Sequence, residues 1–238
     1  MRVLTAQPDV RNRLLATLSQ SDFALLQPDL ERRSLEQGEV IERPGISIDQ
    51  VFFPEPGMVS VVAHTLTGMT LEAGVIGPEG VTGLPLLHGV DQSPNEVRVQ
   101  IPCRALCLPA EALVRALRSS RPLHDHLLRF AHAFQVQLAQ TVVCNGRLTI
   151  NERLARWLLM CHDRADREDL PLTHEFLSLM LGVRRPGITT ALQVLEGAGA
   201  LKMRRGVIAI RDRTVLTEAA GDGYGTAEAE YERLFGRS

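Results

Sequence analysis

Glycine and proline divide the stretch from residue 35 to residue 108 into short pieces, and this spacing limits the possible fold more than any other feature. The breakers recur at Pro44-Gly45, Pro56-Gly57, Thr67-Gly68, Gly77-Pro78 and Pro102. No helix of about ten residues can form between them. The pieces themselves are rich in valine, isoleucine and phenylalanine. Several short strands separated by turns predict an antiparallel β-sandwich or barrel.

The composition is that of an ordinary globular protein. Hydrophobic residues make up 45% of the 238 residues and charged residues 23%, so one or two domains can bury a core without disulfides. The formal net charge of −2 excludes a uniformly basic nucleic-acid coat, although it allows a local basic patch. No apolar run approaches the ~18 residues that a membrane helix needs. Residues 1–15 also lack the apolar centre of a signal peptide, so we expect a cytoplasmic protein with no membrane contact.

Helical patterns lie on both sides of the β-rich stretch. Two short helices are predicted within residues 11–30, and a longer one extends from Pro122 to about Gly146. The apolar positions of the long helix form a narrow stripe, which is compatible with a seam between two helices. We therefore expect a homodimer interface at Leu127, Phe130, Phe134 and Leu138. The alternative is a helix that lies on its own β domain.

The remaining pattern is that of a compact unit over residues 148–216. Helices are predicted from Asn151, from Thr173 to Leu181, and from Arg184 or Arg185 to Gly197. Two short strands follow, with a turn between them at Arg204-Arg205-Gly206. Two helices joined by a glycine-containing turn and followed by a β-hairpin predict a winged helix-turn-helix.

The charge distribution agrees with that prediction. Between residues 184 and 213 there are seven basic and two acidic side chains, a local balance of +5 in a chain of net charge −2. The basic side chains fall on the start of the third helix and on the hairpin, which are the two elements that a winged motif presents to DNA. The alternative is a charged face that is simply solvated.

Taken together, these stretches resemble the Crp/Fnr superfamily of bacterial transcription regulators. The resemblance covers about residues 12–216 and depends on residues 51–60, 74–85, 152–159 and 173–185 together. It implies an α+β protein with an N-terminal antiparallel β-roll of the cyclic-nucleotide-binding type, a long dimerisation helix and a C-terminal winged helix-turn-helix. It also implies a dimer that binds double-stranded DNA at inverted repeats and acts with RNA polymerase.

The resemblance assigns DNA contacts residue by residue. Matched against the family motif, the base-reading positions fall on Arg185, Pro186 and Thr190, with Thr189 beside them; Pro186 replaces the usual glutamate. Arg184 and the wing residues Arg204 and Arg205 are expected to hold phosphates, which position a protein without specifying sequence.

The sequence departs from the family at the phosphate-binding cassette. Nucleotide-binding members carry a Gly-Glu pair and then an arginine on the next loop, whereas Gly77-Pro78-Glu79-Gly80 splits the pair and loop 91–96 has no arginine. A cyclic phosphate needs a cation or a nest of backbone amides. We therefore expect no response to cyclic AMP. Glu79 and Arg98 are the remaining candidates for an effector pocket, and the alternative for Glu79 is a turn cap.

Cofactor and enzyme chemistry have little support. No cysteine precedes Cys103, which argues against an N-terminal iron–sulfur cluster. We expect Cys103 and Cys107 to be buried structural thiols, and Cys161-His162 has no further metal ligands near it in sequence. The scattered histidines predict surface or interface positions, with a haem ligand as a remote alternative. No motif of a hydrolase, a nucleotide-binding loop or a zinc protease is present, so we expect no enzyme, no metal and no cofactor.

We therefore expect a β-roll sensor domain over residues 1–120, a dimerisation helix over 121–147, a winged helix-turn-helix over 148–216 and a flexible tail over 217–238. Two other functions stay open at this point. One is a ligand-binding module that regulates a partner protein, with the C-terminal unit as its docking surface. The other is a hydrolase that uses Cys144 or Cys161, for which the sequence offers no paired base.

Overall fold

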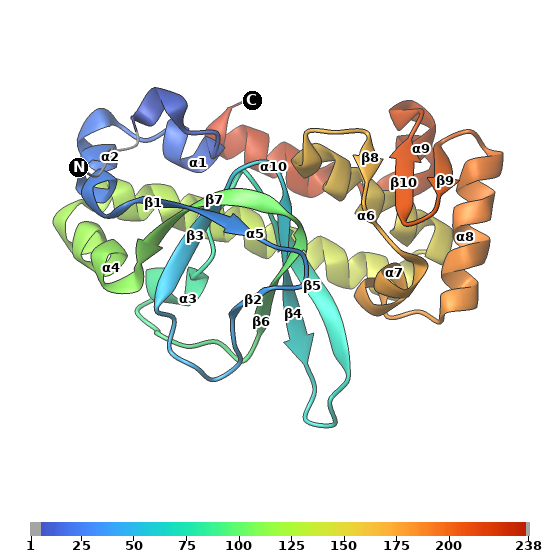
Figure 1. Ribbon diagram of the computed structural model, residues 1–238, viewed down its shortest axis with the longest axis horizontal. Helices are drawn as coiled ribbons and strands as arrows, with labels where there is room; N and C mark the ends of the chain where they lie inside the picture. The colour runs from blue at the N-terminus through green and yellow to red at the C-terminus, as the bar shows by residue number, and fades with distance from the viewer. Residues whose placement is uncertain (1–5, 237–238) are drawn as a thin grey trace.

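The computed structural model describes residues 6–236 (Figure 1). The helices are α1 (Arg13–Ala16), α2 (Gln20–Leu26), α3 (Leu84–Leu87), α4 (Ala110–Ser119), α5 (Arg121–Arg147), α6 (Ile150–Ala165), α7 (His174–Leu181), α8 (Arg185–Gly197), α9 (Arg213–Ala220) and α10 (Thr226–Phe235), with 3₁₀ turns η1 (Gln7–Asp9), η2 (Gln27–Asp29) and η3 (Gly221–Gly223). The strands are β1 (Glu31–Leu35), β2 (Val40–Glu42), β3 (Gln50–Pro54), β4 (Met58–His64), β5 (Thr70–Ile76), β6 (Glu96–Ile101), β7 (Cys103–Pro109), β8 (Asp169–Leu170), β9 (Leu201–Arg204) and β10 (Val207–Ile210).

Two antiparallel sheets form the N-terminal domain, as the spacing of breakers predicts. Their strand orders are β1-β7-β3 and β2-β6-β4-β5, and side chains from both sheets share one hydrophobic core. Gly57 lets the sheets approach each other at one edge: a Cβ atom there would lie 2.3 Å from the Cβ of Cys103, and its φ is +146°. The predicted α+β class is thereby confirmed.

Helix α5 packs its apolar stripe onto these sheets. Leu127, Phe130 and Phe134 are buried in the core of the same chain, and Leu138 is half-buried against it. The close fit depends on Gly80, where a Cβ atom would lie 2.1 Å from Cζ of Phe130. The prediction that Leu127, Phe130 and Phe134 form the dimer seam is therefore wrong, because the helix lies with these side chains on its own β domain. For the half-buried Leu138 it stays a prediction.

A second core forms the C-terminal unit around α6, α7 and α8. Strand order β8-β10-β9 gives the wing a third, very short strand. In Figure 1, α5 runs from the β domain on the left to this unit on the right, and α6 follows it after a short connection. The predicted start and end of the third helix agree with α8.

The end of the chain differs from the predicted flexible tail. The end of α9, η3 and α10 occupy residues 217–235, and α10 returns along α5 (Figure 1). Tyr231 and Phe235 stack with ring centroids 4.7 Å apart and pack against the core of the N-terminal domain. Composition misled here because a few aromatic residues are enough to give an Ala- and Glu-rich helix an apolar side. Residues 1–5 and 237–238, which belong to the predicted first domain and tail, lie outside the described residues.

Within residues 6–236, no helix combines the length and the hydropathy needed to cross a membrane.

Candidate nucleic-acid interface and effector site

Local sequence sets the turn between α7 and α8. The hydroxyl of Thr173 caps α7 by accepting a hydrogen bond from the amide of Phe176, at 3.2 Å. Gly182 ends α7 with a φ of +62°, a conformation that favours glycine. Arg184 is the N-cap of α8 and Pro186 lies in its first turn, where the missing N–H of proline has no cost. The sequence therefore specifies both the bend and the first exposed turn of α8.

One face of α8 is buried and the other is free. Ile188, Ala191, Leu192 and Leu195 point into the core of the C-terminal unit. The side chains predicted to meet DNA lie at the exposed amino end: Arg184, Arg185, Pro186 and Thr190. Thr189 is half-buried, and its hydroxyl donates to the carbonyl of Arg185 at 3.1 Å. Thr189 therefore stabilises the first turn of α8, whereas the other four side chains are exposed to solvent.

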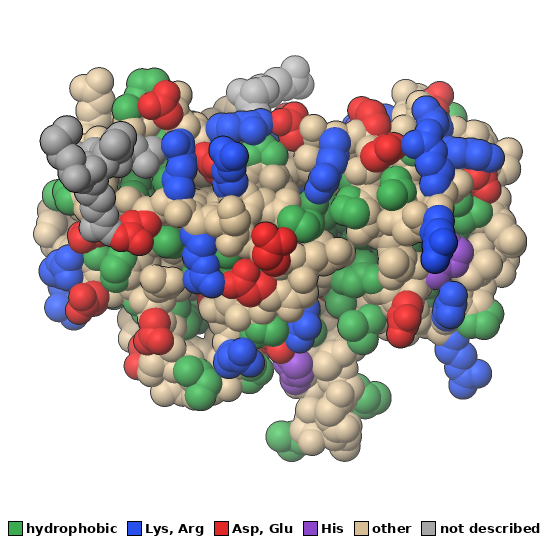
Figure 2. All heavy atoms as spheres, viewed as in Figure 1, with side chains coloured by type: hydrophobic (Ala, Val, Ile, Leu, Met, Phe, Trp, Pro, Cys, Tyr) green, Lys and Arg blue, Asp and Glu red, His purple; other side chains and the backbone are tan. Residues whose placement is uncertain are grey.

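The wing stands beside that exposed end. Arg204 and Arg205 lie on β9 and in the β9–β10 turn, and both are exposed. Together with Arg185 they line one hollow of about 330 Å³ on the surface. Arg204 also pairs with Asp169 at 3.3 Å, across a contact in which both side chains are about half exposed. Figure 2 shows basic side chains over this end of the molecule, on the right.

His174 is a member of this surface that sequence reasoning did not single out. It lies in the first turn of α7 and lines the hollow with Arg185 and the wing residues. Its Nδ1 is 3.0 Å from the hydroxyl of Thr189, which ties α7 to α8. The sequence signal that could have identified His174 is its position directly after the cap Thr173. That position places it in the first turn of α7, which faces the start of α8.

Only some of the seven basic side chains between residues 184 and 213 gather around this hollow. Arg213 turns away from the wing and binds Asp163 at 2.5 Å and the hydroxyl of Tyr224 at 2.7 Å. Lys202 pairs with Glu196 at 3.2 Å. Of these seven basic residues, the ones that line the hollow are Arg185, Arg204 and Arg205.

The outer side of α5 remains uncovered in its carboxyl-terminal half. Val142 and Val143 are 72% and 54% exposed, which is unusual for valine within a long helix. Ala139 and Val136 lie on the same side, one and two turns earlier, respectively. This helix therefore has a buried stripe toward its own sheets and a second, exposed apolar stripe.

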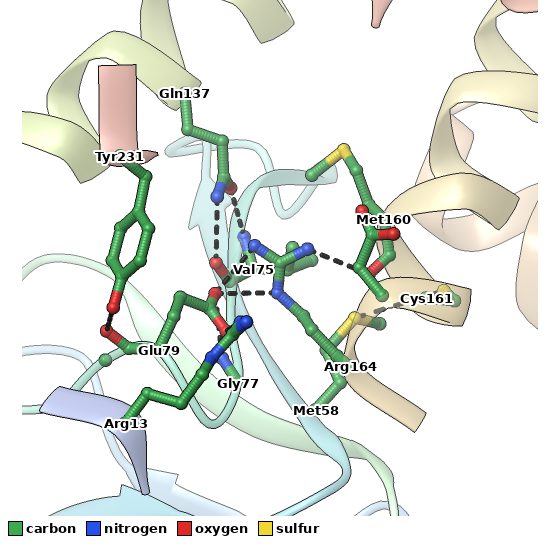
Figure 3. A network of polar contacts seen from close by, with 12 residues as sticks. Arg13, Met58, Val75, Gly77, Glu79, Gln137, Met160, Cys161, Arg164 and Tyr231 are labelled. Atoms are coloured by element: carbon green, nitrogen blue, oxygen red, sulfur yellow. Dashed lines mark hydrogen bonds and ion pairs between the residues drawn. The ribbon is translucent and has the colours of Figure 1, made fainter. Parts of the chain in front are cut away.

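The two residues predicted for an effector pocket do not meet. Glu79 is buried, and its carboxylate binds the guanidinium of Arg164 on α6 at 2.6 Å (Figure 3). Arg98 lies on β6 and pairs with Glu96 at 2.7 Å. Both therefore have partners within the chain. The carboxylate of Glu79 also accepts from the amide of Gly77 at 3.2 Å, so the turn-cap alternative describes it better.

The Glu79–Arg164 pair joins the N-terminal domain to the C-terminal unit. Burial alone lowers the pKa of Arg164, but Glu79 and Asp163 beside it raise that pKa above its ordinary value. The guanidinium therefore stays charged. Arg13 adds a second cation 3.7 Å from Glu79, and the hydroxyl of Tyr231 donates to the backbone carbonyl of Glu79 at 3.1 Å. Figure 3 shows these groups converging on the 77–80 turn.

A second buried carboxylate accepts a hydrogen bond from a backbone amide that follows the 77–80 turn. Glu42, on β2, accepts a hydrogen bond from the amide of Gly83 at 2.6 Å. Burial raises the pKa of Glu42, while hydrogen bonds from Thr82 and Gly83 oppose that rise. The start of α3 therefore faces an acidic side chain of its own chain.

The four cysteines are buried and none forms a disulfide, as expected for structural thiols. Burial raises the pKa of Cys103 to about 12, so this thiol is unreactive. The pKa of Cys161 is also raised, mainly by burial. Among the described residues, no group of three or more histidine, cysteine or acidic side chains is placed to hold a metal ion.

Comparison with family models separates the chain into two known parts. Residues 32–120 match the model of a cyclic nucleotide-binding domain. Residues 152–219 match that of a Crp-like helix-turn-helix domain. No curated protein sequence matches the chain.

Solved structures with this fold include FixK2 from Bradyrhizobium japonicum, which is 19% identical over 80% of this chain and 96% of that chain, with a TM-score of 0.68. A CRP/FNR-family transcriptional regulator from Thermus thermophilus is 21% identical over 82% of this chain and all (100%) of that chain, with a TM-score of 0.66. The c-di-GMP-responsive global regulator CLP of Xanthomonas campestris is 16% identical over 82% of this chain and 100% of that chain, with a TM-score of 0.65. At these identities the likeness concerns the fold.

Removing one partner of the Glu79–Arg164 pair should destabilise the protein strongly. We expect Arg164→Met to lower the free energy of unfolding by about 3–5 kcal/mol, because a carboxylate stays buried without its nearest cation. The double variant Glu79→Gln/Arg164→Met should recover much of that loss. Denaturant unfolding of both variants is the measurement.

Arg11→Met is the matched control. Its pair with Asp166 is similarly short, at 2.5 Å, but both side chains are more than 60% exposed, so the loss should stay below about 1 kcal/mol. Equal losses for Arg11→Met and Arg164→Met would contradict this account of the buried pair.

Proposed function

We propose that this chain, which belongs to the Crp/Fnr superfamily of transcription regulators, acts as a homodimer that reads inverted-repeat DNA without binding cyclic AMP. The observation that carries the DNA-binding part is the grouping of Arg185, Arg204 and Arg205 around one hollow at the exposed end of α8. A helix end with free basic side chains suits the major groove, and a basic wing beside it suits the phosphate backbone. RNA polymerase is the protein partner proposed for this role.

Arg185 is assigned to a base and the wing to phosphates. The guanidinium fork matches the O6 and N7 acceptors of guanine, and Arg185 is exposed in the first turn of α8. Pro186 beside it cannot accept a hydrogen bond from cytosine, so the preferred site differs from one read by a glutamate at this position. Thr190 lies one turn further along. Arg184, Arg204 and Arg205 hold phosphates, which fixes the register of α8 in the groove.

Two arginine variants should separate these roles. Arg185→Ala should lower affinity for a selected site by about 1–3 kcal/mol and relax the choice of base at one position in each half-site. Arg205→Ala should weaken all sequences alike and reduce the salt slope by about one ion. The measurement is a titration against the site selected from random DNA and its single-base variants, at several salt concentrations.

Arg118→Ala is the matched control, because Arg118 is an exposed arginine on α4, in the sensor domain. It should leave both affinity and salt slope unchanged. An equal loss on every sequence for Arg185→Ala would overturn the assignment of base reader. Absence of any DNA retention by the parent protein would overturn the function and favour a protein-docking role.

The exposed stripe on α5 is assigned to the dimer. Val136, Ala139, Val142 and Val143 lie on one side of the carboxyl-terminal half of the helix, away from the core residues. Spacings of three and four residues are those of a two-helix seam. A second copy of α5 would cover this stripe, and two-fold symmetry would place two α8 helices about 34 Å apart, one turn of DNA.

Charge placed on that stripe should separate the protomers. Val142→Glu/Val143→Glu should give folded monomers in sedimentation, because two carboxylates from each copy would face each other. Phe134→Glu should instead unfold the sensor domain, because Phe134 is buried in its own core. A dimer that persists in the double variant would contradict the assignment of this face.

Two features argue against cyclic AMP as the effector. Loop 91–96 offers no arginine to a phosphate, and the amide of Gly83 already donates to the buried carboxylate of Glu42. A phosphate brought to this amide would meet a second anion, and displacing Glu42 would leave that group buried without a donor. In this chain the carboxylate of Glu42 therefore takes the hydrogen bond of the Gly83 amide that a phosphate would need.

Calorimetry with cyclic AMP and cyclic GMP should show no heat at micromolar ligand. Glu42→Gln removes one negative charge and keeps an acceptor for the amide of Gly83, so it serves as the comparison. A micromolar dissociation constant for the parent protein would refute the proposal. Binding by Glu42→Gln alone would identify the internal carboxylate as the obstacle.

A further inference from the structure

Glu72 is a buried carboxyl group at the contact between the β4–β5 hairpin and α6. Its side chain is almost wholly enclosed. The hydroxyl of Ser60, on β4, donates to one carboxylate oxygen. The indole N–H of Trp157, on α6, donates to the other at 2.5 Å. Glu72 thereby joins the sheet of the sensor domain directly to the C-terminal unit.

The contact continues from Trp157 into the helix-turn-helix. The ring of Trp157 lies 5.9 Å from that of Phe176, on α7. Helix α7 also touches β5, since a Cβ atom added at Gly182 would lie 2.7 Å from Leu71. A change at Glu72 can therefore reach the helix that precedes α8 through two packed rings.

The two buried carboxylates that contact α6 differ in their partners. Glu79 has an arginine at 2.6 Å, whereas the donors to Glu72 are a hydroxyl and an indole, which are neutral. A neutral carboxyl group tolerates burial with such partners far better than a carboxylate does. The protonation state of Glu72 therefore matters to this contact more than that of an ion-paired acid.

Every neighbouring cation is directed to another group. Arg156 donates to the hydroxyl of Thr141 at 3.2 Å, and Arg153 donates to the carbonyl of Leu181 at 2.5 Å. Arg164 binds Glu79. The titratable thiols nearby are Cys161 on α6 and Cys144 on α5, both buried. The side of α7 that reaches this region contributes Met180, which is uncharged.

Burial raises the pKa of Glu72 from 4.5 to about 7, although the hydrogen bonds from Ser60 and Trp157 and the charges of Arg156 and Arg164 oppose the rise. The unfolded chain releases this proton near pH 4.5 and the folded chain near pH 7. The folded state therefore loses stability as the pH rises between these values, and the loss is complete above about pH 7.

We propose that Glu72 is a positioning residue for DNA binding: in its protonated form it holds the helix-turn-helix unit firmly on the sensor sheet, and loss of the proton loosens that hold. An ionised carboxylate favours arrangements in which water reaches it, and the contact with α6 is the one that can open to admit water. A unit held in one orientation binds DNA with less ordering cost than a loosened one. DNA affinity should therefore fall as the pH rises through neutrality. This inference rests on the proposed function.

Trp157 is the only tryptophan of the chain, so its fluorescence reports this contact directly. The free protein should show a fluorescence transition with a midpoint near pH 7, because the group that accepts the indole hydrogen bond changes charge. Glu72→Gln keeps an acceptor for the indole N–H and cannot ionise, so the transition should vanish. Ser60→Ala removes a donor to the carboxylate and should move the midpoint to higher pH. Glu111→Gln, at an exposed carboxyl group of α4, is the matched control and should titrate like the parent protein.

The DNA arm uses the full chain and a selected site between pH 6 and pH 8. The parent protein should lose about fivefold or more in affinity relative to Glu72→Gln, the lower end of usual coupling between two sites. The DNA surface is the same in both proteins, so its own contribution cancels in this ratio.

The two arms separate the possible failures. A parent protein without a fluorescence transition, or the same transition in Glu72→Gln, overturns the role of the Glu72 proton. A normal transition with parallel DNA profiles overturns the link to DNA binding. A normal transition with no DNA binding at any pH overturns the proposed function instead, and with it the positioning role for DNA.

Discussion

The packing of α5 against the β-sheets of its own chain is the constraint on which the rest of the structure depends. Phe130 fits over Gly80 because that residue has no side chain, and this fit places the 77–80 turn under α5. The same turn carries Glu79, which binds α6 through Arg164. The position of the C-terminal unit therefore follows from how one helix fits one turn.

The contact between the two units combines two kinds of carboxyl group. Glu79 has cations beside it and acts as a permanent tie. Glu72 has neutral donors and acts as a conditional one. Part of the surrounding contact is apolar or contains sulfur; the thiol of Cys161, for example, lies 3.9 Å from the sulfur of Met58.

The sequence was sufficient for features that depend on local patterns. Glycine and proline spacing predicted the β domain, and the Thr173 cap and Gly182 marked the bend before α8. Prediction from the sequence failed where one hydrophobic pattern is compatible with two different packing partners. The stripe at Phe130 and Phe134 suits a second helix or a sheet equally, and only the three-dimensional fit over Gly80 decides between them. The partners of Glu79 and Glu72 on α6 lie 85 residues away in each case, so no spacing rule could find them. The Ala- and Glu-rich end concealed a docked helix because its apolar side is built from very few residues.

The return of α10 along α5 means that the C-terminal unit is connected to the N-terminal domain twice. The chain enters the C-terminal unit through the α5–α6 connection and leaves it through η3, after which Tyr231 and Phe235 pack on the core of the N-terminal domain. A unit attached at one point can swing about a single hinge. A unit held at two connections can rotate only about an axis that passes through both of them, here the α5–α6 connection and η3, unless α10 dissociates from α5. The direction in which α8 can move is therefore restricted by the topology of the chain as well as by the contacts at its surface.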